Sequence, residues 1–338
     1  MKNREMMNRE IDKYTSLGLK SISLGEIEGM KVGNAQDLKG ITGCTVAIFE
    51  EGAVAGVDVR GGAPGTRETD LLKSENLVDR VHGIILAGGS AFGLDAASGV
   101  MKYLEEKNIG FDVGVGKVPI VPGAVLFDLI MGDPECRPDA KMGYEAAKNA
   151  GKDFQQGSVG AGTGATVGKI LGKEFAMKGG LGAFAFQIGD LKVGALVAVN
   201  AFGDIVKDGE VLAGVYDRKK NHFLTTEGAL LQGGRENPFN GNTTIGIIVT
   251  NGSFSKPEMN KIASMAQNGY ARAISPSHTM VDGDTVFAAA TGVVKGKVND
   301  VNLAGHLAAL AMQEAIYRGI MEAETLDGVP GRSEMKDE

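Results

Sequence analysis

The chain has 338 residues, a formal net charge of −7 and no stripe of basic residues, which argues against a nucleic-acid-binding protein. It carries 51 glycines without the period of a collagen, and no run approaches the ~20 apolar residues of a membrane span. Because its two cysteines form no Cys-x-x-Cys pair and no apolar leader is visible, we expect a cytoplasmic protein without a membrane or nucleic-acid partner.

The chain mixes strand-like and helix-like segments. β-Branched and small apolar runs predict strands at 44–49, 53–59, 83–87, 183–188, 192–199, 243–250 and 285–290. Helical periodicity predicts helices at 92–106, 140–150, 256–267 and 300–321, the last with a broad apolar stripe. Helices that cover sheets in this way predict an α/β sandwich, which we expect to form a single catalytic domain over residues 1–338.

Two glycine-rich segments resemble catalytic motifs without completing them. The segment 88–92 has Phe92 where a nucleophile elbow needs glycine, so Ser90 is expected to cap a helix instead. The segment 164–169 lacks the first glycine of a phosphate loop and has Ile170 where serine or threonine would bind magnesium. The histidines show no metal-ligand spacing, so we expect neither a metal nor a cofactor.

The strand predicted at 243–250 begins with Thr243, directly after Gly241 and Asn242. If the bond between Asn242 and Thr243 is cut, Thr243 gains a free α-amine beside its hydroxyl. An α-amine has a pKa of about 7.7–8.0, so it can act as the base for its own residue's nucleophile near neutral pH. Asn242–Thr244 also fits the N-glycosylation pattern, which is the alternative reading of this segment.

Two carboxylates follow in the segment Asp282-Gly283-Asp284. Side chains two apart on a strand point the same way, so Asp282 and Asp284 could reach one spot and orient the Thr243 amine and hydroxyl. Gly283 between them permits a close backbone approach. The alternative is a solvated turn, because Asp-Gly is also a strong hairpin signal.

At these residues the chain resembles the P1 peptidase family of L-aminopeptidase/D-esterases, β-peptidyl aminopeptidases and nylon-oligomer hydrolases. Local similarity is greatest to the nylon-oligomer hydrolases, at 241–244 and 278–285. Further matching segments are 58–63, 86–94, 161–169 and the strand that ends at Asn200. The resemblance implies a four-layer αββα sandwich of the N-terminal-nucleophile type, self-processed into fragments 1–242 and 243–338, and a homo-oligomer that is a tetramer of processed protomers.

The resemblance also implies individual roles. Thr243 is the nucleophile, Asn242 precedes the cut, and Asp282 and Asp284 support the nucleophile. Lys169 matches an active-site lysine and Asn200 an asparagine that stabilises the oxyanion. Taken alone, Lys169 would be read as a surface lysine and Asn200 as a strand-end turn residue.

One position departs from the family pattern. Phe127 stands where the family usually has a tyrosine, so the substrate-binding hydrogen bond of that hydroxyl is absent here. We expect a more apolar pocket wall at Phe127.

We interpret the chain as a self-processing threonine hydrolase of peptides or other short amides, including 6-aminohexanoate oligomers, acting through an acyl-enzyme. One alternative is an acyltransferase of the ornithine acetyltransferase type, in which an amine accepts the acyl group. A second is a non-catalytic binding protein on the same scaffold, which would leave the chain uncut.

Overall fold

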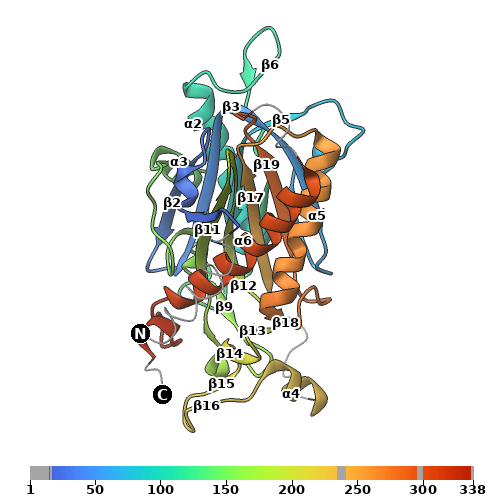
Figure 1. Cartoon of the computed structure of the whole chain (residues 1–338). Coiled ribbons are helices and arrows are strands. Elements are labelled where there is room, and N and C mark those ends of the chain that lie inside the picture. Colours follow the sequence, from blue (N-terminus) through green and yellow to red (C-terminus); the bar gives the residue numbers. More distant parts are fainter. Residues whose placement is uncertain (1–14, 16, 234–240, 295–299, 336–338) are drawn as a thin grey trace.

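The computed structural model describes residues 15, 17–233, 241–294 and 300–335 (Figure 1). The helices are α2 (Ala96–Glu106), α3 (Ala140–Lys148), α4 (Thr226–Leu231), α5 (Lys256–Ala273) and α6 (Val301–Met321). None of the described helices is both long and apolar enough to cross a membrane.

One ten-stranded mixed sheet dominates the structure, in the order β1-β11-β12-β17-β19-β3-β5-β8-β4, with β2 also paired to β3. Its strands are β1 (Leu19–Ile22), β2 (Lys31–Asp37), β3 (Thr42–Val59), β4 (Gly65–Arg67), β5 (Arg80–Ala87), β8 (Gly123–Val125), β11 (Gly180–Ile188), β12 (Leu191–Asn200), β17 (Thr243–Thr250) and β19 (Thr285–Ala290).

Short strands form small sheets at the ends of the molecule. They are β6 (Phe111–Asp112) with β7 (Lys117–Val118), β9 (Thr166–Val167) with β10 (Met177–Lys178), β15 (Tyr216–Asp217) with β16 (His222–Phe223), and β14 (Glu210–Ala213), β13 (Asp204–Lys207) and β18 (Ile274–Ser275) together.

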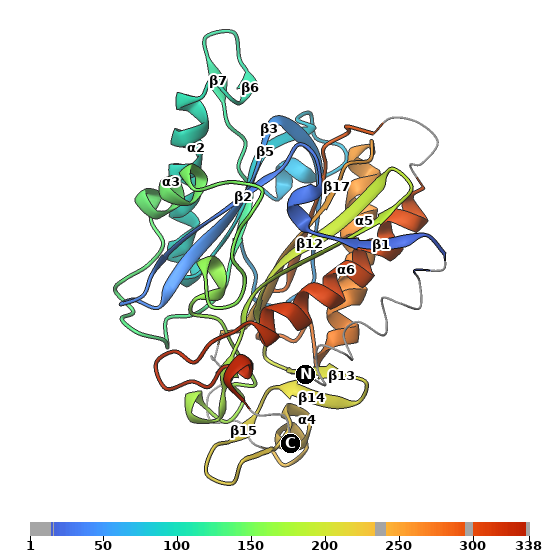
Figure 2. The ribbon, with the colours of Figure 1, turned by 60° about the vertical axis from the view of Figure 1, so that its left-hand side comes forward.

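The long strand β3 joins two halves of the large sheet. Its first part pairs with β2 and β5, whereas its last part pairs with β19. The two halves face each other across a central apolar core that contains Phe49, Ile84, Leu196, Ile247 and Phe287. Helices α5 and α6 cover one outer face and α2 and α3 the other, as Figure 2 shows. The expected αββα arrangement of layers is therefore confirmed.

Strand β17 is buried along its whole length because it lies between two of these cores. Ile245, Ile247 and Val249 point into the core between the two halves of the sheet, and Ile248 points toward α5 and α6. Burial on both faces explains why this strand is a continuous apolar run rather than an alternating one.

Glycine allows unusually close packing of helices on this sheet. A Cβ at Gly182 in β11 would lie 1.9 Å from the carbonyl oxygen of Ala315 in α6. A Cβ at Gly99 in α2 would lie 1.7 Å from the carbonyl oxygen of Ala140 in α3. The high glycine content thus reflects backbone-to-backbone contact between layers.

The strands at 243–250 and 285–290 are confirmed with the expected bounds, and all four expected helices are present with differences at their boundaries. The two strands expected at 44–49 and 53–59 are one strand, β3. The helix expected from residue 92 begins at Ala96, because Ser90–Asp95 form a 3-10 turn that starts with Ser90 in the left-handed region, at φ 54°. Helix α5 continues to Ala273, beyond the expected end at 267.

Candidate active site

Thr243 is the first residue of β17 and lies where the ends of three neighbouring strands, β12, β17 and β19, come together. The residue opposite it is Asn200, the last residue of β12. Strand β19 runs parallel to β17, so both strands begin at this end, and Asp282 pairs with Asn242 just before them. The parallel register therefore brings two segments that are distant in the chain together, and all four of these residues are buried.

The Thr243 hydroxyl is held between two backbone groups. It donates to the carbonyl oxygen of Asn242 and accepts from the Gly283 N–H, with an N···O distance of 3.2 Å. The same Gly283 N–H also donates to the Asn242 carbonyl oxygen at 2.9 Å. A Cβ at residue 283 would lie 2.7 Å from Thr243 Oγ1, so only glycine lets this N–H approach so closely.

The two aspartates support Thr243 through its neighbours. Asp284 accepts from the Thr244 N–H at 2.7 Å and contacts His278 through its backbone N–H at 3.0 Å and its ring Nδ1 at 2.9 Å. Asp282 accepts from the N–H groups of Phe202 at 3.1 Å and Thr279 at 3.0 Å. Within the described residues neither carboxylate hydrogen-bonds the Thr243 side chain itself: Asp284 binds the N–H of the next residue, Thr244, and Asp282 binds the backbone of Phe202 and Thr279.

His278, Thr279 and the Phe202 N–H were not among the residues singled out from the sequence. His278 lies in the segment 278–285, which resembles the nylon-oligomer hydrolases and contains both aspartates. Its position six residues before Asp284 in that segment was the sequence signal that could have identified it. Phe202 contributes only a backbone N–H, which leaves no mark on residue identity.

Asn200 and Lys169 form a buried polar pair next to Thr243. The ammonium of Lys169 donates to Asn200 Oδ1 at 2.8 Å and to its backbone oxygen at 3.2 Å, and the Thr166 N–H donates to the same Oδ1 at 2.9 Å. These donors assign the amide orientation, and the Asn200 NH2 group donates to the Phe127 carbonyl at 3.1 Å. Lys169 is thus a buried residue rather than a surface lysine, and Asn200 presents a donor rather than an acceptor at this strand end.

Burial shifts two pKa values in the site toward neutrality. Burial, followed by the neighbouring Asp284 carboxylate, raises the pKa of Asp282 to about 6. Burial also lowers the pKa of Lys169 to about 7, although Asp282 and Asp128 oppose that shift. Groups that titrate near neutral pH in a buried cluster are typical of catalytic sites.

A buried carboxylate, Asp128, and a buried ammonium, Lys178, hold the backbone beside the site. Asp128 accepts from the Gly89 N–H at 2.6 Å and from Thr42 Oγ1 at 2.7 Å, which ties down the turn that contains Ser90. Burial raises the pKa of Asp128. Lys178 donates to the carbonyls of Thr163 and Ala165 at 2.6 and 2.7 Å, and burial lowers its pKa to about 7. The sequence analysis did not anticipate these two residues.

A pocket of about 430 Å³ opens onto Thr243. Its lining comprises Ala63, Pro64, Gly65, Ser90, Ala91, Val125, Leu126, Phe127, Gly241, Asn242, Thr243, Met280 and Val281. None of these described lining residues is charged, and the Phe127 ring packs so closely on Gly241 that a Cβ there would lie 2.6 Å from it. The wall expected at Phe127 is therefore present and apolar.

No group of three or more His, Cys, Asp or Glu side chains in the described part of the chain is arranged to hold a metal ion. The polar groups that surround Thr243 are instead suited to amide chemistry: a hydroxyl beside a carbonyl, N–H donors directed at oxygen, and two titratable groups near neutrality.

The sequence and the fold both match known hydrolases. Residues 23–334 match the profile of peptidase family S58. An uncharacterized aminopeptidase of Mycobacterium tuberculosis (strain ATCC 25618 / H37Rv) is 40% identical over 344 residues, which cover 93% of this chain and 97% of that protein. The 6-aminohexanoate-oligomer endohydrolase of Paenarthrobacter ureafaciens is 34% identical over 272 residues, or 79% of this chain and 74% of that protein.

Among solved structures, the L-aminopeptidase D-Ala-esterase/amidase of Ochrobactrum anthropi, described as a variant of the Ntn hydrolase fold, superimposes with a TM-score of 0.69. The superposition covers 94% of this chain and 93% of that one at 16% identity, and it confirms the fold.

Proposed function

The chain belongs to peptidase family S58 and is a hydrolase of amide bonds, and we propose that it cuts itself between Asn242 and Thr243 and then uses Thr243 as its nucleophile. The observation that carries this proposal is the Gly283 N–H, which lies within hydrogen-bond distance of both Thr243 Oγ1 and the Asn242 carbonyl oxygen. Nucleophile, target carbonyl and an N–H donor for the developing oxyanion are thus together in the uncut chain.

Self-cleavage would proceed by an N-to-O acyl shift. Thr243 Oγ1 loses its proton and attacks the Asn242 carbonyl carbon, and the Gly283 N–H stabilises the negative charge on the carbonyl oxygen. The C–N bond then breaks, the nitrogen takes up the proton, and Asn242 is left as an ester on the Thr243 oxygen. Water hydrolyses that ester, which leaves a carboxylate at the end of fragment 1–242 and restores the hydroxyl of Thr243, whose α-amine is now the free N-terminus of fragment 243–338.

In turnover the new α-amine of Thr243 serves as the base. It accepts the hydroxyl proton as the oxygen attacks a substrate amide, and it returns a proton to the leaving amine, so that an acyl-enzyme ester remains for water to hydrolyse. Asn200, opposite Thr243 in the register, supplies an amide donor to the oxyanion. Lys169 holds Asn200 in the donor orientation, while Asp282 and Asp284 hold the backbone around the nucleophile.

The proposed substrates are peptides or other short linear amides. An aminopeptidase and a 6-aminohexanoate-oligomer endohydrolase are among the relatives by name. The uncharged, largely apolar lining of the pocket supports a substrate with an apolar side chain in contact with the Phe127 ring.

Intact mass spectrometry of the purified protein tests the proposal. The parent should give two masses that correspond to 1–242 and 243–338, whereas Thr243→Ala should give one full-length mass. Thr243→Ser keeps a hydroxyl and should still be cut. Thr244→Val is the matched control, because the Thr244 hydroxyl is buried with no hydrogen-bond partner in the described part of the chain and valine has the same shape. An active parent with an intact Asn242–Thr243 bond would contradict the mechanism.

A further inference from the structure

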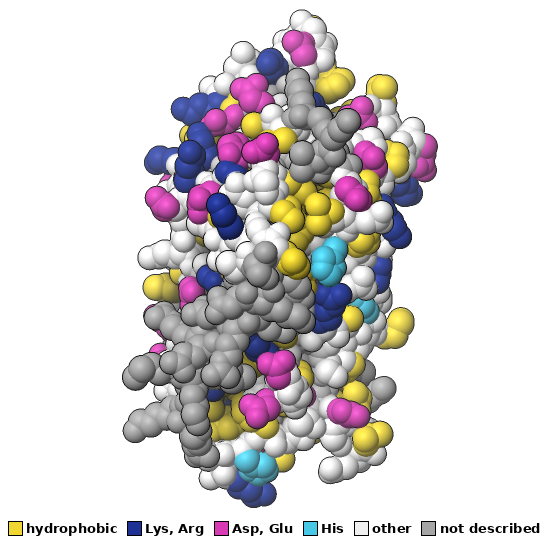
Figure 3. All heavy atoms as spheres, in the orientation of Figure 1, with side chains coloured by type: hydrophobic (Ala, Val, Ile, Leu, Met, Phe, Trp, Pro, Cys, Tyr) yellow, Lys and Arg dark blue, Asp and Glu magenta, His cyan; other side chains and the backbone are white. Residues whose placement is uncertain are grey.

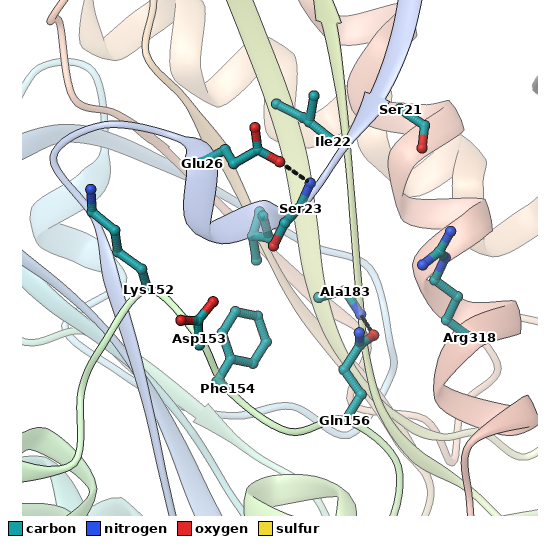
Figure 4. Close-up of a pocket in the computed structure, with 11 residues that line it drawn as sticks. Ser21, Ile22, Ser23, Glu26, Lys152, Asp153, Phe154, Gln156, Ala183 and Arg318 are labelled. Carbon is teal, nitrogen blue, oxygen red and sulfur yellow. Dashed lines mark hydrogen bonds between the residues drawn. The ribbon is translucent and has the colours of Figure 1, made fainter.

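A second cavity, of about 390 Å³, lies at the edge of the large sheet between β1, the segment 152–156 and α6 (Figure 4). It has no lining residue in common with the pocket beside Thr243. Four charged side chains line it: Glu26, Lys152, Asp153 and Arg318. Their formal charges cancel, in contrast to the uncharged lining of the pocket beside Thr243.

Arg318 is the most unusual of these side chains. Its guanidinium carbon lies 4.4 Å from the centre of the Phe184 ring, and its Nε is buried with no hydrogen-bond partner among the described residues. Burial lowers the pKa of the Arg318 guanidinium, although Glu314 on α6 and Glu322 just after its end oppose that shift. No hydrogen bond or ion pair to Arg318 occurs within the described residues, although a guanidinium that is half-buried, with its Nε fully buried, ordinarily has such a partner.

Neutral hydrogen-bonding groups face the same cavity. Ser21 on β1 lies on the same side of the cavity as Arg318, with its hydroxyl directed toward the guanidinium (Figure 4). Gln156 uses its Oε1 to accept from the Ala183 N–H at 2.5 Å, so its NH2 group is left to donate. This side of the cavity therefore presents donors, which suits a carboxylate.

The opposite side presents an acceptor. Asp153 lies across the cavity from Arg318, and within the described residues it makes no hydrogen bond or ion pair (Figure 4). The Glu26 carboxylate, in contrast, is engaged by the Ser23 N–H at 2.8 Å. Asp153 is thus the carboxylate of the cavity that can receive a ligand cation.

We propose that this cavity binds a small zwitterion: an α-amino acid or a short ω-amino acid, with its carboxylate on the Arg318 fork and its ammonium toward Asp153. The planar guanidinium can hold a carboxylate through two parallel hydrogen bonds, and its stacking on Phe184 fixes the plane of the fork. Amide hydrolysis creates one new carboxylate and one new amine, which are the two groups that such a zwitterion carries. The inference does not depend on which residue is the nucleophile.

Isothermal titration calorimetry on the full purified protein tests the site with L-leucine and 6-aminohexanoate as probes. Two analogues of the second probe separate the charges: N-acetyl-6-aminohexanoate lacks the ammonium and 6-aminohexanamide lacks the carboxylate. We expect the parent protein to bind at least one of the two amino acids. If it binds 6-aminohexanoate, both analogues should bind to the protein more weakly than 6-aminohexanoate does. Arg318→Met should weaken binding by about tenfold or more, as expected for loss of a charge-assisted pair.

Two further variants keep the test decisive if Arg318→Met disturbs the packing on Phe184. Arg318→Lys keeps the positive charge but loses the planar fork, and Asp153→Asn, at an exposed position, removes only the proposed partner of the ammonium. Both variants should weaken binding of the amino acid. Asp153→Asn should leave the affinity for N-acetyl-6-aminohexanoate unchanged. Exposed Arg272→Met is the matched control and should bind as the parent does. Absence of binding to the parent, or binding that the Arg318 and Asp153 variants leave unchanged, would overturn the proposal, because the ligand would then sit elsewhere.

Discussion

Replacing Gly283 with alanine tests the geometry on which the proposed self-cleavage rests. The new Cβ would lie 2.7 Å from Thr243 Oγ1, 2.9 Å from the Ala63 carbonyl oxygen and 3.2 Å from Thr243 Cγ2. Ala63 cannot give way easily, because its own N–H donates to the Asp282 carbonyl at 2.8 Å. The segment around residue 283 must therefore move away from Thr243.

The size of the effect follows from the two hydrogen bonds that this movement lengthens. The Gly283 N–H lies 2.9 Å from the Asn242 carbonyl oxygen and 3.2 Å from Thr243 Oγ1, and the second contact is already long. Loss of one preorganised oxyanion donor typically costs about 2.7–4 kcal/mol, or about 10²–10³ in rate. We expect Gly283→Ala to slow self-cleavage by that factor without preventing folding.

The assay is a time course of intact and cut chain after purification, read by mass spectrometry or on a denaturing gel. Gly116→Ala is the matched control, because a Cβ there meets nothing within 4 Å and its φ is ordinary. Circular dichroism melting shows whether each variant is folded. A folded Gly283→Ala protein that is cut at the parent rate would refute the role of this N–H.

Four other substitutions test separate parts of the structure. Asn200→Ala should lower kcat about 10²–10³-fold in steady-state assays on aminoacyl anilides, and turnover at the parent rate would mean that the oxyanion donors lie elsewhere. Phe127→Tyr should change KM or the ranking of anilides against a 6-aminohexanoate oligomer while leaving self-cleavage intact; unchanged kinetics on both substrates would remove Phe127 from the binding wall. Because burial raises the pKa of Asp282 from 3.8 to about 6, ionising it disfavours the folded state as pH rises from about 4 to 6. At pH 8 the Asp282→Asn protein should therefore be more stable than the parent by up to about 3 kcal/mol, whereas at pH 4 it should not be; it should also turn over more slowly. Equal stability of the two proteins in urea melts at both pH values would contradict the raised pKa of Asp282. Gly182→Ala should destabilise the fold by about 1–3 kcal/mol in urea melts, because its Cβ would overlap the backbone of α6, and a midpoint equal to that of Gly116→Ala would contradict that packing.

Much of the scaffold follows from local sequence patterns. The run that starts at Thr243 is buried on both faces, so its apolar, β-branched composition predicts a strand with the observed bounds, and the same holds for 285–290. The predicted helix boundaries were wrong where the backbone conformation differs from what hydrophobic periodicity indicates. Ser90, for example, has a left-handed φ, and α2 begins only at Ala96.

The sequence by itself identified the family, the layered fold and the residues proposed to carry the chemistry, because hydroxyl, carboxylate and amide side chains are visible in it. The tertiary structure alone decided how they meet. The parallel register of β17 and β19 places the Gly283 N–H against Thr243 and Asn242, and the turn after β12 brings the Phe202 N–H to Asp282. Backbone donors are the same in every residue but proline, so no sequence pattern marks the few that enter a site. Burial is likewise a property of the packed layers, and it is burial that moves the pKa values of Asp282 and Lys169 toward neutrality.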